Sequence, residues 1–231
     1  MKRENCTKLG ANSVAPKQRR AVATRKELIR AARIVFARDG FEHTRIEEIA
    51  ARAGKTRGAF YDNFEDKEDV FFAIFEEDLL SDQKKFLPRL HAAATQDERV
   101  EALTDILAGL LRDRQRCLLN LEFKMYVIRH PRKQNRLAAL HAAMLLRCVM
   151  TEINQQLPEM AEMTLAERTK RKLELTATVD GFAMNKLFTP DRLGDQQVRR
   201  YLRLTLRQTI FQGKDSPSSL RKVARLGVPR N

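Results

Sequence analysis

Apolar residues recur at helical spacing along nearly the whole 231-residue chain. In residues 46–64, IEEIAARAGKTRGAFYDNF, the apolar positions from Ile46 to Ala53 repeat every three or four residues and define one face of a helix. Gly54 follows at once, where a helix end favours a residue that accepts the left-handed conformation. Phe60 and Phe64, one turn apart, give a second helix its buried face. The pattern predicts two short helices joined by a tight glycine turn.

The flanking residues extend this helical pattern in both directions. Thr24 with Glu27 and Thr44 with Glu47 have the spacing of capping boxes, so we expect helices to begin at both places. Asp66 is placed to cap a further helix. The predicted buried stripes are Leu28, Ala32, Val35 and Phe36 before the glycine turn, and Val70, Phe71, Ile74, Phe75 and Leu79 after it.

The remaining residues predict helices and no strand with a period of two. The expected helices cover about 100–110, 118–129, 137–157, 165–187 and 198–211. The predicted fold is all-α, with an N-terminal three-helix helix-turn-helix module and a larger C-terminal helical bundle. The predicted segments are a disordered basic arm (1–23), the helix-turn-helix domain (24–70), the bundle (71–212) and a flexible basic tail (213–231).

The net charge of +14 is concentrated at the two ends of the chain. Residues 1–26 hold eight basic residues and one acidic residue, and residues 213–231 hold five and one. Basic ends on a nearly neutral body favour contact with a polyanion such as the nucleic-acid backbone. The alternative is that the basic ends only increase solubility.

Several other classes of protein are not favoured by the composition. No stretch approaches the roughly 18 uninterrupted apolar residues of a membrane span, and the N-terminus lacks the apolar core of a signal peptide. Cys6, Cys117 and Cys148 are odd in number and widely spaced, which favours free thiols in a reducing cytoplasm. The scattered histidines show no metal-ligand spacing, and no catalytic motif occurs. We expect no enzyme activity, no cofactor and no metal.

Residues 24–72 resemble the DNA-binding module of the TetR family of bacterial transcriptional regulators. The resemblance rests on Gly40-Phe41, Thr44, Ile49-Ala50, Ala53-Gly54, Thr56-Arg57-Gly58, Phe60-Tyr61, Phe64 and Asp66-Lys67.

A recognition helix reads base edges with its N-terminal residues, which here are Thr56, Arg57 and Gly58. Arg57 could bind guanine through two hydrogen bonds, and Gly58 would let the backbone approach the DNA. The resemblance implies phosphate contacts at the remaining positions, which are Thr44, Tyr61 and Lys67, and the ammonium of Lys55 could reach DNA as well. The alternatives are a cap for Thr56, a partly buried ring for Tyr61, and an ion pair of Lys67 with Glu65 or Asp69.

The predicted DNA-binding module is itself acidic. Residues 27–70 hold eight basic and ten acidic residues, so the attraction to DNA must come from elsewhere. We expect the basic arm to supply it, with phosphate or minor-groove contacts from Arg19, Arg20, Arg25 and Lys26.

The family resemblance also implies a homodimer and a small-molecule effector. For the dimer we expect helices 132–156 and 165–188 to pair, with Leu137, Met144, Cys148 and Gly181 in the interface. Polar or aromatic residues on apolar stripes are candidate ligand contacts, namely Glu122, Phe123, Tyr126, Arg147, Phe182 and Asn185.

The function expected from these features is repression of transcription at a palindromic operator in double-stranded DNA. An apolar or amphipathic effector would release the repressor. The alternative is a DNA-architectural or RNA-binding protein that uses its basic tails without sequence specificity.

Overall fold

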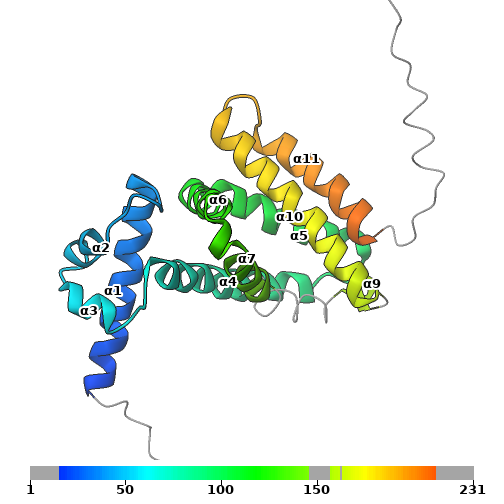
Figure 1. Cartoon of the computed structure of the whole chain (residues 1–231). Coiled ribbons are helices and arrows are strands. Elements are labelled where there is room, and N and C mark those ends of the chain that lie inside the picture. Colours follow the sequence, from blue (N-terminus) through cyan, green and yellow to red (C-terminus); the bar gives the residue numbers. More distant parts are fainter. Residues whose placement is uncertain (1–15, 146–156, 162, 212–231) are drawn as a thin grey trace, which may run out of the picture. The chain divides into compact units, whose positions relative to one another are not determined.

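The computed structural model describes residues 16–145, 157–161 and 163–211 (Figure 1). All regular secondary structure in these residues is helical, which confirms the predicted all-α class. The chain forms two compact units, residues 1–75 and 76–231. The division falls inside helix α4, Lys67–His91, a few residues beyond the expected boundary at residue 70.

The first unit consists of α1 (Pro16–Asp39), α2 (Ile46–Arg52), α3 (Arg57–Tyr61) and the first turns of α4. Its core is aromatic: the ring centroids of Phe41 and Phe71 lie 5.8 Å apart, and those of Phe60 and Phe64 lie 5.5 Å apart. All the stripe residues predicted between 28 and 79 are buried. As expected, the carboxylate of Asp66 caps α4, accepting from the backbone N–H of Asp69 at 2.8 Å.

Helix α1 begins eight residues earlier than predicted, so residues 16–23 are helical and the disordered arm cannot extend through them. Proline suits the first position of a helix, and the exposed residues after it are good helix formers. The absence of an apolar stripe there reflects exposure to solvent, not the lack of a helix. Thr24 therefore lies inside α1 and caps nothing, and Glu27 instead pairs with Lys55 at 2.8 Å. Residues 1–15 lie outside the described residues.

Glycines with positive φ end the first two helices. Gly40, at φ 80°, donates its N–H to the carbonyl of Phe36 and ends α1. Gly54, at φ 65°, donates to the Ala51 carbonyl while Lys55 donates to the Ala50 carbonyl. This pair of bonds is a Schellman motif, and it satisfies the last carbonyls of α2. The predicted glycine turn is confirmed.

The second unit contains the rest of α4 and the helices that follow it. These are α5 (Gln96–Arg112), α6 (Arg114–Arg129), α7 (Pro131–Leu145), α9 (Pro158–Ala161), α10 (Leu165–Phe188), α11 (Asp195–Leu206) and the π-helix η2 (Arg207–Phe211). Thr95, Asp113 and Thr164 cap α5, α6 and α10 through their side-chain oxygens. The tail 213–231 lies outside the described residues.

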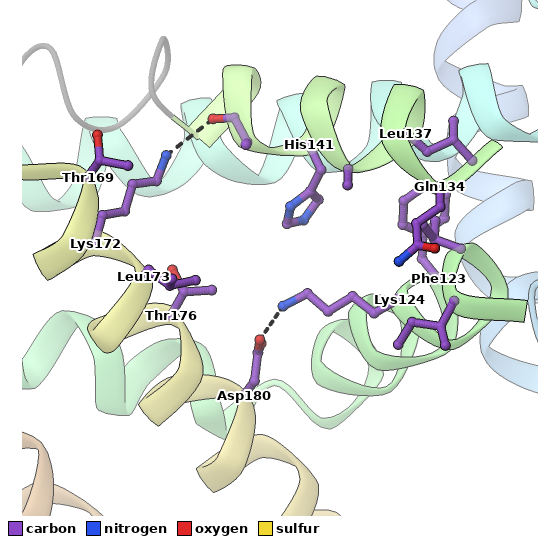
Figure 2. Close-up of a pocket in the computed structure, with 14 residues that line it drawn as sticks. Phe123, Lys124, Gln134, Leu137, His141, Thr169, Lys172, Leu173, Thr176 and Asp180 are labelled. Atoms are coloured by element: carbon purple, nitrogen blue, oxygen red, sulfur yellow. Dashed lines mark hydrogen bonds and ion pairs between the residues drawn. The ribbon is translucent and has the colours of Figure 1, made fainter. Parts of the chain in front are cut away.

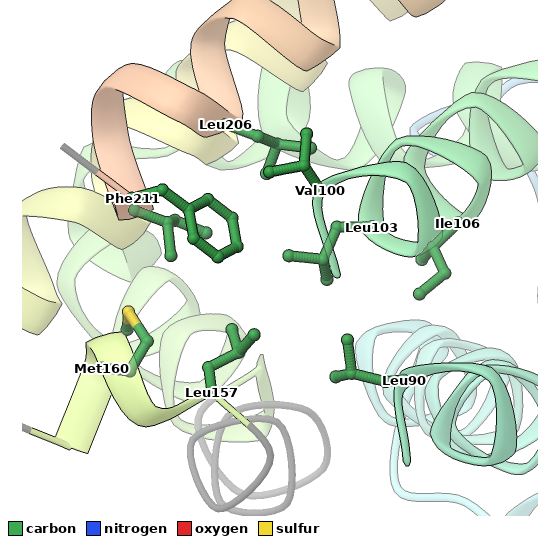
Figure 3. Packing of buried hydrophobic residues seen from close by; sticks show 9 residues of the cluster. Leu90, Val100, Leu103, Ile106, Leu157, Met160, Leu206 and Phe211 are labelled. Carbon is green, nitrogen blue, oxygen red and sulfur yellow. The ribbon is translucent and has the colours of Figure 1, made fainter. Parts of the chain in front are cut away.

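Helix α5 is central to the second unit. Its apolar side packs Val100, Leu103 and Ile106 against Leu90 of α4, Leu206 of α11 and Phe211 of η2 (Figure 3). Its polar side carries acidic residues four apart, which pair in reverse order with basic residues four apart: Asp97 with Arg207, Glu101 with Arg203, and Asp105 with Arg199. The two patterns together fix α5 antiparallel to α11.

No helix in the described part of the chain is long and apolar enough to cross a membrane.

Candidate nucleic-acid interface and effector cavity

Helix α3 is held in place by its cap and by its aromatic face. The hydroxyl oxygen of Thr56 accepts from the backbone N–H of Ala59 at 3.1 Å, so the predicted cap is present. Phe60 is fully buried beneath the helix. Gly58 is exposed, and a Cβ built there would meet just one atom within 4 Å among the described residues, the Thr56 hydroxyl oxygen at 3.7 Å. Packing within the chain therefore does not explain why residue 58 is a glycine. A close approach of another molecule to the backbone of α3 would explain it.

Arg57 and Tyr61 form the exposed surface of α3. The Arg57 side chain is 62% exposed and pairs with Glu47 of α2 at 3.0 Å. Its guanidinium also lies 5.5 Å from the centre of the Tyr61 ring. Tyr61 is 46% exposed, so its hydroxyl can reach a partner in solvent. An exposed ion pair such as Arg57–Glu47 contributes little to stability and can exchange for a base contact at low cost.

The predicted contact between Thr44 and a DNA phosphate is wrong, because Thr44 is buried. The residue is 4% exposed, and its hydroxyl donates to the Gly40 carbonyl at 2.7 Å. Helix α2 begins one residue later than the predicted capping box, with Arg45 as the N-cap and the Arg45 N–H donating to Glu48 at 3.0 Å. The Thr44 hydroxyl is thus engaged inside the loop between α1 and α2 and is not presented to phosphate.

Three of the basic residues predicted to contact DNA also hold the module together. Lys67 donates from its ammonium to the carbonyls of Phe41 and Glu42, which fixes the loop between α1 and α2. The guanidinium of Arg25 lies 4.3 Å from the centre of the Phe64 ring and donates to the Asn63 carbonyl at 3.0 Å. The third is Lys55, through its ion pair with Glu27 on α1.

Three further basic residues predicted to contact DNA are exposed on the first half of α1. Arg19, Arg20 and Lys26 all lie on the surface of this helix. Like Arg57, these three side chains are exposed to solvent.

A cavity of about 480 Å³ lies within the second unit, among α6, α7 and α10 (Figure 2). Most of its wall is apolar, and the side chains of Phe123, Val127 and Leu137 contribute to it. The full lining is Phe123, Lys124, Val127, Ile128, Gln134, Leu137, Ala138, His141, Ala142, Thr169, Lys172, Leu173, Thr176 and Asp180.

The charged groups of the cavity come from all three helices. Lys124 of α6 forms an ion pair with Asp180 of α10. Lys172 of α10 donates to the Ala142 carbonyl of α7 at 3.2 Å, and burial lowers the pKa of its ammonium. His141 points into the space between these lysines (Figure 2). Burial, and then the charges of Lys124 and Lys172, lower the pKa of His141 to about 4, so its ring is neutral at pH 7.

Of the five predicted ligand contacts that the structure describes, only Phe123 lines this cavity. Tyr126 is buried at the corner between α6 and α7, where the Lys133 ammonium donates to its hydroxyl at 3.0 Å. Phe182 stacks on Tyr201, and Asn185 is exposed and donates to the Gly181 carbonyl. Glu122 is half-buried outside the lining, and Arg147 lies outside the described residues.

The sequence contains a signal for two charged residues of the cavity, Lys124 and Asp180, that were not among the predicted ligand contacts. Lys124 and Asp180 interrupt otherwise apolar runs, FKMYVI and VDGF. A charge in such a run requires a partner or a cavity.

The residues predicted for the dimer interface fall into different environments. Leu137 is fully buried and lines the cavity, so it cannot contribute to an interface between protomers. Met144 is half-buried and Gly181 is exposed. Cys148 lies outside the described residues.

Comparison with known proteins finds a family match for the first unit. Residues 28–74 match the family model described as bacterial regulatory proteins, tetR family. The HTH-type transcriptional repressor AcnR of Corynebacterium diphtheriae is 32% identical over 84 residues, 36% of this chain and 40% of AcnR. The repressor BepR of Brucella suis is 46% identical over 54 residues, 23% of this chain and 26% of BepR. The chain therefore spans less than half the length of these curated relatives.

Solved structures extend the likeness to the second unit. A transcriptional regulator from Rhodococcus sp. Rha1 matches with a TM-score of 0.58 and 23% identity, over 83% of this chain and 98% of that chain. The SmeT–triclosan complex matches with a TM-score of 0.55 and 21% identity, over 90% of this chain and all of that chain. At sequence identities this low, the similarity shows only that these proteins share a fold.

We expect Arg57→Ala to weaken binding to the preferred duplex by roughly tenfold or more, because a bidentate contact to guanine contributes about 1–3 kcal/mol. Fluorescence anisotropy with labelled preferred and random duplexes would measure the effect. The control is Arg38→Ala, which removes an equal charge from an exposed arginine near the end of α1 that pairs with Asp39 and is not a predicted DNA contact. Equal losses of affinity on both duplexes, matching those of Arg38→Ala, would show that Arg57 does not read bases.

Proposed function

We propose that this chain, which belongs to the TetR family of bacterial regulatory proteins, is a sequence-specific transcriptional repressor released from DNA by a small molecule. The observation that carries the proposal is α3, a capped helix whose exposed face presents Arg57, Gly58 and Tyr61. The cavity in the second unit supports an effector. The names of the relatives support repression, and the SmeT–triclosan complex supports a small-molecule ligand.

The attraction to DNA requires basic groups that the module does not use internally. Because Arg25, Lys55 and Lys67 each contact other groups of the module, their charges are partly satisfied within the chain. Arg19 and Arg20 are exposed on the first turns of α1, outside the acidic segment 27–70. We therefore assign most of the phosphate contact to this end of α1 and the residues before it.

The proposed dimer surface is one face of α10 together with α11. Met184 and Phe188 are 55% and 84% exposed, and Gly181 on the same face has open space where a Cβ would lie. Tyr201 and Leu204 of α11 are about half exposed, and Tyr201 stacks on Phe182 of α10, which joins the two helices into one apolar surface. A patch of this kind favours a protein partner, and a second copy would give the two-fold symmetry of a palindromic operator.

This surface replaces the pair of helices expected from the sequence. That pair included residues 132–156, but Leu137 of that segment faces the cavity. Helix α11, with its exposed Tyr201 and Leu204, takes its place beside α10 in the proposal.

The cavity and α4 are connected through α6. Arg116, in the first turn of α6, pairs with Asp82 of α4 at 2.6 Å and with Asp78 at 3.6 Å. Further along α6, Phe123 and Val127 line the cavity. We propose that a ligand displaces α6 and that Arg116 carries the displacement to α4.

Selection of bound sequences from a random duplex pool would test the proposed function. We expect an inverted repeat, preferred over random DNA by roughly a thousandfold or more. Equal binding to all sequences would contradict the proposal and support an architectural protein. Preference for single-stranded or structured RNA would support the RNA-binding alternative.

We expect the double variant Arg19→Ala/Arg20→Ala to lower the salt dependence of binding to the selected duplex. The slope of log affinity against log salt should fall by about 0.9 for each phosphate that the variant no longer neutralises. Affinity measured from low to moderate salt would give the slope, with Arg38→Ala as the single-charge control. An unchanged slope would exclude these two arginines as phosphate contacts.

We expect Met184→Glu to convert the dimer to a monomer and to abolish high-affinity operator binding, because it places a charge in the apolar α10–α11 surface. Sedimentation velocity would measure the assembly, and circular dichroism would confirm that the helices are retained. The matched control is Leu140→Glu on α7, which carries the same charge change at a 42% exposed leucine. Dissociation by Leu140→Glu but not by Met184→Glu would instead favour the α7 surface.

A further inference from the structure

Among the described residues, Lys172 is the charged group of the cavity that lacks an acidic partner. Its ammonium has three donors, and in the described part of the chain it makes one hydrogen bond, to the Ala142 carbonyl. Burial lowers the pKa of the group, so water does not fully solvate its charge. A partly desolvated cation of this kind gains free energy from any anion that reaches it.

The other charged groups of the cavity do not supply that anion. Asp180 is the one carboxylate among the described lining residues, and Lys124 pairs with it. His141 is neutral at pH 7 and adds no charge. This lining therefore holds two ammonium groups and one carboxylate, which leaves one positive charge in excess at the end of the cavity where Lys172 meets α7.

The rest of the wall is suited to a hydrocarbon or aromatic body. Phe123 and Val127 of α6 and Leu173 of α10 contribute apolar surface, and the polar members of the wall, such as Thr176, carry no charge. Figure 2 shows Lys172 and Phe123 on opposite sides of the open space. A ligand can thus place a charged end at Lys172 and an apolar end toward Phe123.

We propose that the cavity binds a hydrophobic monocarboxylate, with its carboxylate on Lys172 beside His141 and its apolar body along α6. A cation would meet the excess positive charge, and a dianion would bring more negative charge than the lining balances. A neutral alcohol would fill the same volume without pairing with Lys172. The regulatory effect of this ligand rests on the proposed function above, whereas the binding itself does not.

Calorimetry with three ligands that share one body would test the charge preference. Decanoate, decan-1-ol and decylamine have the same alkyl chain and differ in the charge of the head group. We expect the full chain to bind decanoate about tenfold or more tightly than decan-1-ol, below the concentrations at which micelles form, because a hydrogen bond to a charged group contributes about 1.5–3 kcal/mol. Decylamine should bind most weakly. Equal affinity for decanoate and decan-1-ol, or tighter binding of decylamine, would overturn the proposal.

Variants of Lys172 would locate the carboxylate. Lys172→Met should reduce decanoate affinity about tenfold and leave decan-1-ol affinity unchanged, whereas Lys172→Arg should keep the preference for decanoate. The control is Lys170→Met, which removes a charge from an exposed lysine of the same helix outside the cavity lining. If Lys170→Met and Lys172→Met have the same effect, the decanoate is not held at Lys172.

Measuring both operator binding and decanoate binding distinguishes failure of the proposed ligand from failure of the proposed DNA-binding function. If the chain selects an operator but decanoate neither binds nor releases it, the ligand class is wrong and the DNA-binding function stands. If no operator is selected while decanoate binds and depends on Lys172, the DNA-binding function is wrong and the ligand site stands.

Discussion

Helix α3 has five residues, too few to be stable in water on its own, so its position depends on what surrounds it. The Schellman turn at Gly54 fixes where it begins, Thr56 caps it, and Phe60 anchors its inner face. Arg25 of α1, packed on the Phe64 ring, closes the other end. These contacts fix the helix so that Arg57 and Tyr61 lie on its exposed face. Such preorganisation is what a base-reading surface requires.

The same constraint divides the basic residues of the first unit into two groups. Arg25, Lys55 and Lys67 satisfy carbonyls, a carboxylate and ring faces inside the module, where their long stems also cover apolar surface. Arg57 and the arginines on the first turns of α1 remain exposed. A module with more acidic than basic residues can therefore hold its own fold with some of its cations while the remaining ones face solvent.

Much of this could be predicted from the sequence, because helix periods, caps and a left-handed glycine are local properties. The core of the first unit, the cap at Thr56 and the turn at Gly54 follow from residues a few positions apart. The predicted start of α1 was wrong because its exposed first turns leave no apolar stripe to detect. The prediction for Thr44 was wrong because its partner, the Gly40 carbonyl, depends on how the loop folds. The cavity was missed for a similar reason: Lys124, His141 and Lys172 lie on three helices, and no local pattern brings them together.

The two lysines and one aspartate of the cavity suit a site where ligand binding changes the conformation of the protein. A ligand shifts a conformational equilibrium only by the difference between its affinities for the two states, so it must change contacts that differ between them. In the proposed mechanism the ligand acts on α6, which the Lys124–Asp180 ion pair ties to α10. Weakening that pair frees the segment of α6 that continues toward Arg116 and its bonds to Asp78 and Asp82 of α4. A neutral ligand of the same shape would fill the cavity and leave the pair intact. The charge of the ligand, more than its size, would then decide whether it releases the repressor or merely binds to it.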